Sequence, residues 1–248
     1  MSSKRNRTII EISGEETLNF LQGLITNDIE KLGKGIIYAA MLTPQGKYFV
    51  DLFIIAYKGR ILIDVSKEVS DDLQTKLLLY RLRAKVDIIE TSISVSTGID
   101  NPPIGAFKDP RHEALGWRSY ENSSINQGVD WKKLRVAYGI PETNIELIRD
   151  KTYILEAGFE KLNGVDFKKG CYVGQEITAR MKHKTTLRKG LIKVSVIGET
   201  PVGTEILADG RPAGVLYSQS DGHGLAFLKL DRASPKMKAG EATVIIEN

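Results

Sequence analysis

The sequence predicts an α+β protein with a largely antiparallel sheet and a small C-terminal β-barrel. Helix-like and strand-like segments are mixed along the 248 residues without a strict β–α–β alternation, which disfavours a parallel sheet. Short turns join neighbouring strand candidates, as in antiparallel hairpins. Beyond residue 188, glycines recur between short alternating strands, which is typical of a small barrel or sandwich.

The first hundred residues contain most of the expected strands. A β-branched strand over 8–12 is followed by a glycine turn and by a helix that begins near Glu15 or Glu16, where leucines recur at helical spacing. Residues 71–83 form a second helix by the same criterion. Further strands are expected at 36–41, 48–55, 61–65, 86–90 and 93–97.

After a break at 101–103 the chain is richer in loops. We expect a short strand around Trp117 and a helix over 130–138 that glycine and proline terminate. A loop-rich stretch follows over 141–172. A helix over 173–182 is then entered through a tight glycine turn.

The last part of the chain has a different residue pattern, which begins with a strand at 191–197 in which apolar and polar residues alternate. We therefore predict a region of residues 1–186, with a sub-boundary near residue 100, and a barrel of residues 187–248. The boundary lies near Thr186.

Composition narrows the class of protein. The chain has 35 basic and 31 acidic residues, a net charge of +4, and this small excess does not argue for nucleic acid. One cysteine cannot form an intramolecular disulfide, which predicts a reducing compartment. No apolar run reaches the roughly 18 residues that span a bilayer, and no signal peptide is recognisable. We expect a cytoplasmic monomer without membrane attachment.

The segment 168–176 carries the most specific chemistry. The only cysteine, Cys171, follows two lysines and precedes an expected helix N-terminus, and both features favour a thiolate. Residues 168–193 hold eight basic residues and one acid. The alternatives are a small buried cysteine and an ordinary solvated basic face. The three histidines are scattered, so we predict no metal site.

A family resemblance begins in this segment. The stretch KGCYVGQE (169–176), continuing as ITARMKHKTTLRK, resembles the signature of the YgfZ family. These folate-binding proteins resemble the glycine-cleavage T protein and include mitochondrial factors that mature [4Fe–4S] proteins. Further similar segments are FLQGLITND (20–28), YRLRAKV (80–86), LRVAYGIPE (134–142) and LNGVDFKKG (162–170).

The resemblance implies a folate-binding α+β body with a C-terminal β-barrel. It also implies a role in assembly or repair of iron–sulfur proteins, including the radical enzyme that methylthiolates tRNA. The expected partners are folate and, transiently, iron–sulfur client or scaffold proteins.

Tetrahydrofolate presents adjacent N–H donors on its pterin, which a carboxylate can accept together. Glu156 in LEAG (155–158) resembles the pterin-binding glutamate of the T protein. Basic residues such as Arg180, Lys182 and Arg188 would bind the anionic glutamate tail. The cofactor-binding candidates are Glu156, Asn27, Asp28, Gly170, Tyr172, Gly174, Gln175, Glu176 and Arg180.

For Thr26, Asn27 and Asp28, ordinary turn chemistry at a helix end is the alternative to ligand binding.

We expect Cys171 to be partly exposed beside the folate cleft and to act as a thiolate in transient chemistry. Lys169 would lower the pKa of the thiol. The two glycines of the segment would shape the loop, and Gln175 and Glu176 would fix it by hydrogen bonds.

One departure from the T protein bears on enzymatic activity. That protein has a Gly-Gly-x-x-Asp-Asp-Leu stretch containing its catalytic aspartate, whereas residues 46–52 read GKYFVDL here. Val50 replaces one aspartate, and only Asp51 remains to handle a proton on a folate nitrogen. The T protein also lacks an equivalent of KGCYVGQE. A tetrahydrofolate-dependent aminomethyltransferase is therefore the alternative function, and the sequence leaves open whether the chain is an enzyme.

A second alternative is an RNA-interacting module built on the basic run 168–193. Tyr172 is the only Phe, Trp or Tyr in that run, so aromatic stacking on bases has little support. Direct RNA binding therefore ranks last.

Overall fold

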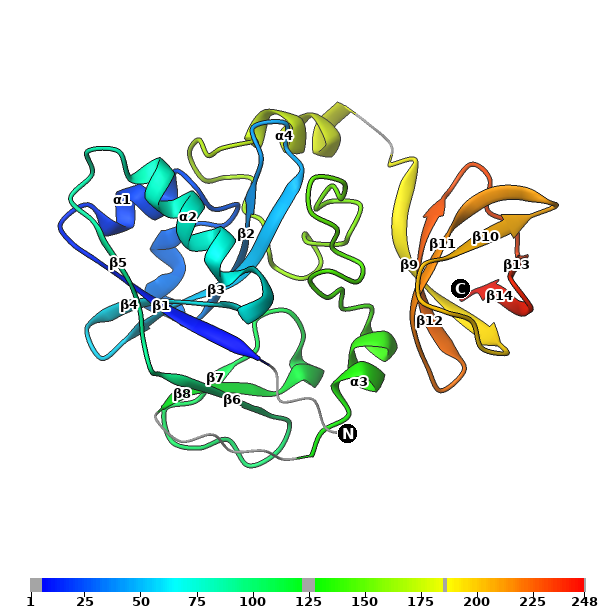
Figure 1. Ribbon diagram of the computed structural model, residues 1–248, viewed down its shortest axis with the longest axis horizontal. Helices are drawn as coiled ribbons and strands as arrows, with labels where there is room; N and C mark the ends of the chain where they lie inside the picture. The colour runs from blue at the N-terminus through cyan, green and yellow to red at the C-terminus, as the bar shows by residue number, and fades with distance from the viewer. Residues whose placement is uncertain (1–5, 122–127, 185–186, 248) are drawn as a thin grey trace. The chain divides into compact units, whose positions relative to one another are not determined.

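The computed structural model describes residues 6–121, 128–184 and 187–247 (Figure 1). The chain divides into two compact units. The first comprises Met1–Val129 and Glu160–Gln175, and the second comprises Asp130–Phe159 and Glu176–Asn248. The predicted boundary near Thr186 lies outside the described residues. The predicted α+β class is confirmed, and all pairs of named strands in the described ranges are antiparallel.

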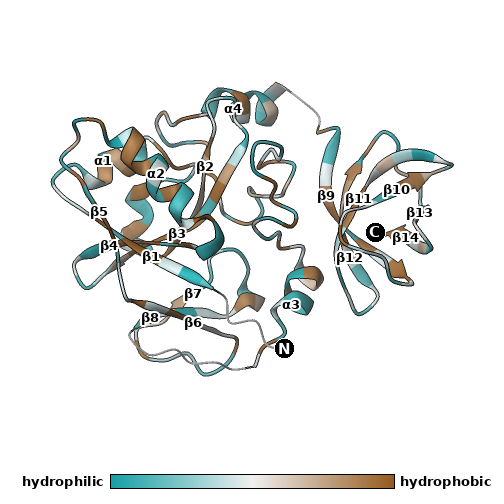
Figure 2. Cartoon of the chain, viewed as in Figure 1, coloured by the Kyte–Doolittle hydropathy of each residue, from teal (hydrophilic) through white to brown (hydrophobic). Residues whose placement is uncertain are grey.

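A five-stranded sheet forms the centre of the first unit, in the order β2-β3-β4-β1-β5. Its strands carry apolar residues over much of their length (Figure 2). The five strands predicted for this region are confirmed, with ends shifted by one or two residues. They are β1 (Arg7–Ser13), β2 (Ile37–Leu42), β3 (Tyr48–Tyr57), β4 (Arg60–Ser66) and β5 (Asp87–Glu90).

One face of this sheet is packed against helices. Leu21 of α1 (Thr17–Gln22) and Leu73 and Leu77 of α2 (Ser70–Arg81) share an apolar core with the sheet. The short 3-10 helices η1 (Ile29–Lys34) and η2 (Lys67–Val69) lie between the elements. The second helix ends two residues earlier than predicted, at Arg81.

The opposite face carries a buried network of charges. The carboxylate of Asp64 on β4 is fully buried and accepts hydrogen bonds from Arg7, Arg118 and Tyr120. The Arg118 guanidinium also lies 3.9 Å from the centre of the Phe53 ring. Burial alone would raise the pKa of Asp64, but the two guanidiniums outweigh it and hold that pKa below its ordinary value, as ion pairing does for carboxylates.

Arg118 comes from a second sheet of the first unit, so the network joins segments that are far apart in sequence. This sheet has the order β6-β8-β7. The strands predicted at 93–97 and around Trp117 are both confirmed. Their bounds are β6 (Ser94–Gly98), β7 (Phe107–Lys108) and β8 (Trp117–Glu121), with η3 (Glu113–Leu115) before β8.

The second unit contains the predicted C-terminal barrel, which is confirmed. Six strands close in the order β10-β11-β12-β9-β14-β13, and β13 pairs with β10. Valines, leucines and alanines from all six strands fill the interior. The strands are β9 (Lys189–Ile197), β10 (Thr204–Ala208), β11 (Arg211–Ser220), β12 (His223–Lys229), β13 (Lys236–Ala239) and β14 (Ala242–Ile246).

A buried arginine attaches the segment Asp130–Phe159 to the barrel. Arg135, on α3 (Trp131–Tyr138), donates to the hydroxyl of Ser218 on β11 and to the carboxylate of Glu146. Glu146 in turn accepts the backbone N–H of Ser218. These contacts explain why this segment, which the sequence grouped with the N-terminal region, belongs to the compact unit of the barrel.

Among the described helices, none is both long and apolar enough to cross a membrane. The longest is α2, with 12 residues.

Candidate functional site

Cys171 is exposed, as predicted. It lies on the loop before α4 (Gln175–Lys184), which begins two residues later than expected. Within the described residues no hydrogen bond reaches its Sγ atom. The thiol is therefore available to solvent and to a partner, and the alternative of a buried apolar cysteine is excluded.

Lys169 anchors this loop from inside the protein. Its Nζ atom lies 2.7, 2.6 and 3.0 Å from the carbonyl oxygens of Gln22, Ile25 and Asn27. The residue is buried, and burial lowers its pKa to about 8 against the opposing Asp28 and Asp166 carboxylates. Three carbonyls are the number of acceptors that one ammonium group can satisfy.

This arrangement differs from the role predicted for Lys169. The ammonium is committed to backbone carbonyls, where it joins the Cys171 loop to the turn after α1. Closeness in sequence suggested that it would act on the thiol, but it does not show which way the side chain points. The structure therefore gives Lys169 an anchoring role, and its predicted effect on the thiol stays a prediction.

The predicted Thr26-Asn27-Asp28 segment lies in the same junction. The Thr26 hydroxyl donates to the Gly164 carbonyl and accepts the N–H of Ala40 on β2. The Asn27 amide donates to the carbonyls of Tyr38 and Asn163.

The Asn27 side-chain oxygen accepts from Asp28 N–H and from Lys31. Both ends of the amide are thus engaged within the protein. Asp28 caps η1 by accepting the N–H of Glu30. These contacts fit the turn-forming alternative for Asn27 and Asp28, and their contact with a folate stays a prediction.

Gly174 lets the loop approach the β2–β3 turn closely. Its φ is +83°, and an added Cβ would lie 2.5 Å from the Thr43 carbonyl oxygen and 2.9 Å from Leu42 Cβ. Only glycine fits such a position without strain. Gly170 has no such requirement, because no atom lies within 4 Å of the place that a Cβ would occupy there.

The remaining loop residues are placed differently from one another. Tyr172 is buried, with its ring centre 5.0 Å from Lys169 Nζ. Gln175 contributes its backbone N–H to the Tyr172 carbonyl. In the part of the chain that the structure describes, the side chains of Gln175 and Glu176 make no hydrogen bond to the loop. The predicted side-chain hydrogen bonds of these two residues therefore do not hold the loop in place.

Asp51 is buried in β3 rather than open to a ligand. Its carboxylate oxygens accept hydrogen bonds from the hydroxyls of Tyr38 and Tyr48, at 3.1 and 2.8 Å. Burial and the neighbouring Asp51 carboxylate raise the pKa of Tyr38 well above its ordinary value. The arrangement resembles a structural polar cluster more than a proton-transfer site.

Glu156 lines a cavity of about 260 Å³ within the second unit. Phe227 and Tyr217 from the barrel contribute aromatic rings, and burial raises the pKa of Tyr217. Three lysines also line the cavity, from the loop before Glu156 and from the barrel: Lys151, Lys189 and Lys229.

The three basic residues predicted to bind a folate tail are exposed, and none of them lines this cavity. Arg180 and Lys182 lie on α4, and Arg188 directly precedes the barrel. Neither Arg180 nor Arg188 forms an ion pair within the described ranges. Their predicted contact with a folate tail stays a prediction.

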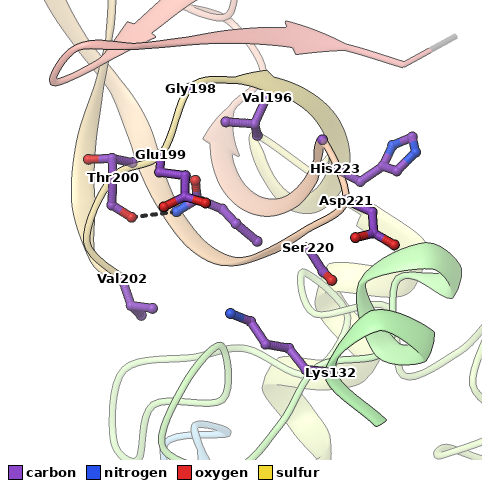
Figure 3. Close-up of a pocket in the computed structure, with 11 residues that line it drawn as sticks. Lys132, Val196, Gly198, Glu199, Thr200, Val202, Ser220, Asp221 and His223 are labelled. Carbon is purple, nitrogen blue, oxygen red and sulfur yellow. Dashed lines mark hydrogen bonds between the residues drawn. The ribbon is translucent and has the colours of Figure 1, made fainter. Parts of the chain in front are cut away.

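A second cavity of about 210 Å³ lies at one end of the barrel (Figure 3). The β9–β10 and β11–β12 loops line it, together with Lys132 of α3. In Figure 3, Lys132 comes from α3, Ser220 from the end of β11 and Glu199 from the β9–β10 loop. None of the residues predicted from the sequence lines this cavity.

Several residues that shape these sites escaped the sequence analysis. Phe227, Tyr217 and Lys189 reach the cavity beside Glu156 only through barrel closure. For the buried charges a signal was available: Asp64 is the only charge in the apolar stretch ILIDV of β4, and Arg118 follows Trp117 in a buried strand. A single charge inside an apolar strand indicates a buried partner of opposite sign.

Substitution of Gly174 with alanine tests the close approach of the loop. We expect Gly174→Ala to lower the free energy of unfolding by more than about 1 kcal/mol, because the positive φ and the backbone contact both oppose a Cβ. Cys171 should also react faster with a thiol reagent as the loop loosens. Gly170→Ala is the control and should stay within about 0.5 kcal/mol of wild type. Equal effects of the two changes would contradict the contact with the β2–β3 turn.

Titration of Lys169 tests its burial. The NMR signal of its side chain should titrate with a midpoint near 8, against about 10.4 for free lysine. Between these pH values the unfolded chain binds a proton that the folded chain lacks, so stability rises with pH. Urea unfolding of wild type should show this rise relative to Lys169→Met. A midpoint near that of free lysine would refute the assignment.

Comparison with known proteins agrees with this architecture. Residues 188–247 match the family model described as "CAF17, C-terminal beta-barrel domain". The glycine cleavage system aminomethyltransferase T from Bartonella henselae superimposes with a TM-score of 0.78, over 98% of this chain and 83% of that chain. The sequences are 11% identical, so this similarity establishes the fold alone.

Sequence relatives give a more specific result. The IBA57 iron–sulfur cluster assembly factor of Homo sapiens is 28% identical over 90% of this chain and 75% of its own length. The homologue of Mycosarcoma maydis is 29% identical over 77% of this chain, which spans 55% of that relative. Both are named mitochondrial. The expectation of a cytoplasmic location is therefore contradicted.

The same comparison makes the family assignment more specific than the YgfZ resemblance, because these relatives are IBA57 proteins. The homologue of Phaeosphaeria nodorum is 31% identical, over 91% of this chain and 69% of its own length. Identity at this level over more than two thirds of a relative shows the family. The chain belongs to the IBA57-type, YgfZ-related family of iron–sulfur cluster assembly factors.

Proposed function

We propose that this chain supports the assembly or repair of [4Fe–4S] proteins through the thiol of Cys171. The observation that carries the proposal is an exposed thiol on a loop that a buried lysine holds in place. A fixed but accessible thiol suits transient contact with a cluster or a client. The family membership supports the same role.

One thiol limits what the chain can do with a cluster. Fe–S clusters are commonly held by four cysteine thiolates, and Cys171 is the only cysteine of this sequence. A cluster held here would therefore need further ligands from a partner. The proposed partners are client or scaffold proteins that bind transiently, and radical enzymes of tRNA modification are among the proposed clients. The names of the relatives point to mitochondria as the setting.

We further propose that the cavity beside Glu156 binds a tetrahydrofolate. The residues fit the chemistry: a carboxylate can accept the N–H donors of a pterin, and Phe227 and Tyr217 can contact its ring. Lys151 and Lys189 suit an anionic glutamate tail. When bound, the folate supplies a carrier for one-carbon units.

The arrangement of Asp51 bears on the alternative of an aminomethyltransferase. Its carboxylate is buried and bonded to two tyrosine hydroxyls, an arrangement that does not favour proton transfer to a folate nitrogen. The assembly role is therefore preferred.

Complementation tests the role of the thiol. The wild-type chain should restore the activity of a [4Fe–4S] enzyme, under oxidative stress, in a bacterium that lacks its own YgfZ-type factor. Cys171→Ala at matched expression should not, because the only thiol is gone. Rescue by both proteins would make Cys171 dispensable. Failure of both proteins, although each is soluble, would contradict the assembly role. The alternative function would then be tested by an assay for tetrahydrofolate-dependent aminomethyl transfer.

Calorimetry with 5-formyltetrahydrofolate tests the folate proposal separately. Glu156→Gln should weaken binding roughly tenfold to a hundredfold, as expected when a charge-assisted hydrogen bond is lost. Glu199→Gln, in the other cavity of the same unit, is the matched control and should bind like wild type. Equal affinities of the two variants would place the folate elsewhere.

A further inference from the structure

Three leucines at the C-terminal end of α2 are exposed. The exposed fractions are 49% for Leu78, 64% for Leu79 and 85% for Leu82. The neighbouring Leu77 is fully buried and anchors the helix on the sheet. Single exposed leucines are ordinary on a protein surface, but a contiguous apolar group is typical of an interaction site.

Leu82 also has a backbone conformation that suits glycine. Its φ and ψ are 45° and −106°, close to the 63° and −115° of Gly116 after η3. A bulky side chain in this region is strained. Such strain persists only where the surroundings impose it, and it is frequent at functional positions.

The surroundings of Leu82 do impose it. The Ala84 N–H donates to the Arg81 carbonyl, and the Lys85 N–H donates to the carboxylate of Glu16. Gly14 packs so closely against the carbonyl of Lys85 that no Cβ would fit between them. The segment YRLRAKV, which the thiol and the folate cavity do not explain, is thus fastened so that Leu82 faces solvent.

Two arginines flank the exposed leucine. Arg81 is half-buried and Arg83 is exposed. Within the described part of the chain neither forms an ion pair, although arginine pairs readily with carboxylates. The acids closest to this segment, Glu15 and Glu16, contact Lys85. Asp71 and Asp72 lie at the other end of the same helix. An anionic bilayer lying flat along α2 would meet these acids, which favours a protein partner over a membrane.

We propose that Leu78, Leu79, Leu82, Arg81 and Arg83, the leucine–arginine patch, dock an acidic amphipathic helix of a partner protein. Leucines of the partner would cover the exposed leucines. Its carboxylates would pair with the two guanidiniums.

The proposed partner is an iron–sulfur client or scaffold protein, and this identity rests on the proposed function. The position of the patch fits such a partner. At the start of α1, Glu16 accepts the N–H of Lys85, which belongs to the segment YRLRAKV. At the end of α1, the Gln22 carbonyl accepts from Lys169 of the Cys171 loop. The six residues of α1 span about 9 Å. Both α1 and α2 cover the same face of the five-stranded sheet (Figure 1). A helix docked on the patch would bring its protein near the thiol.

Fluorescence anisotropy with a designed peptide tests the patch on the full chain. The probe is a labelled helical peptide with leucines on one face and glutamates on the other. It should bind wild type, and Arg81→Glu/Arg83→Glu should weaken binding by at least about tenfold, through loss of two charge-assisted contacts. Arg211→Glu, an exposed arginine on the barrel, is the control and should bind like wild type. Equal binding by both variants, or no binding by wild type, would overturn the proposal.

A second variant separates docking from folding. Leu82→Gly should raise the melting temperature, because glycine relieves the strain, and should still weaken peptide binding. A raised melting temperature with unchanged binding would overturn the role of Leu82. Sedimentation with phosphatidylglycerol vesicles is the remaining arm, and vesicle binding that Arg81→Glu/Arg83→Glu abolishes would replace the protein partner with a membrane. These assays need neither cluster nor folate, so they can fail or succeed independently of the complementation test.

Discussion

The buried ammonium group of Lys169 constrains the whole environment of the thiol. A charge removed from water must be compensated by polar partners, and here three backbone carbonyls at the turn after α1 supply them. The chain near residue 25 and the chain near residue 169 must therefore fold against each other. Thr26 and Asn27 strengthen the same junction. Lys169 and Tyr172 are buried on either side of Gly170 and Cys171, which are both exposed.

The same physical principle recurs in both units. Asp64 in the first unit and Glu146 in the second are fully buried carboxylates, and each binds a buried arginine. Arg118 reaches Asp64 from a distant strand, whereas Glu146 binds Arg135 of its own segment and the backbone N–H of Ser218 on the barrel. Breaking such a pair is costly because it leaves an uncompensated charge. These networks join segments that lie far apart in sequence.

The chain keeps its chemical groups in separate places, each built in a different way. The thiol is presented by a loop fastened through backbone carbonyls, whereas Glu156 lines a cavity formed by its own loop and by barrel strands. The leucine–arginine patch depends on a strained residue held by hydrogen bonds on both sides. An assembly factor needs to meet partners more than to enclose a substrate, and exposed groups on a firm framework suit that task.

Much of the framework can be predicted from the sequence, because hydrophobic periodicity is a local property. The strands of the first sheet and of the barrel follow from such local patterns, whereas the exposure of Cys171 is an expectation from the family resemblance of KGCYVGQE. The sequence could not show that Lys169 points to carbonyls rather than to Cys171, since neighbours in sequence can face opposite ways. It placed the end of α2 two residues late, because the contacts of Glu16 and Gly14 with Lys85 impose the conformation of Leu82. Burial and long-range hydrogen bonds decide such details, and they exist only once distant segments have come together.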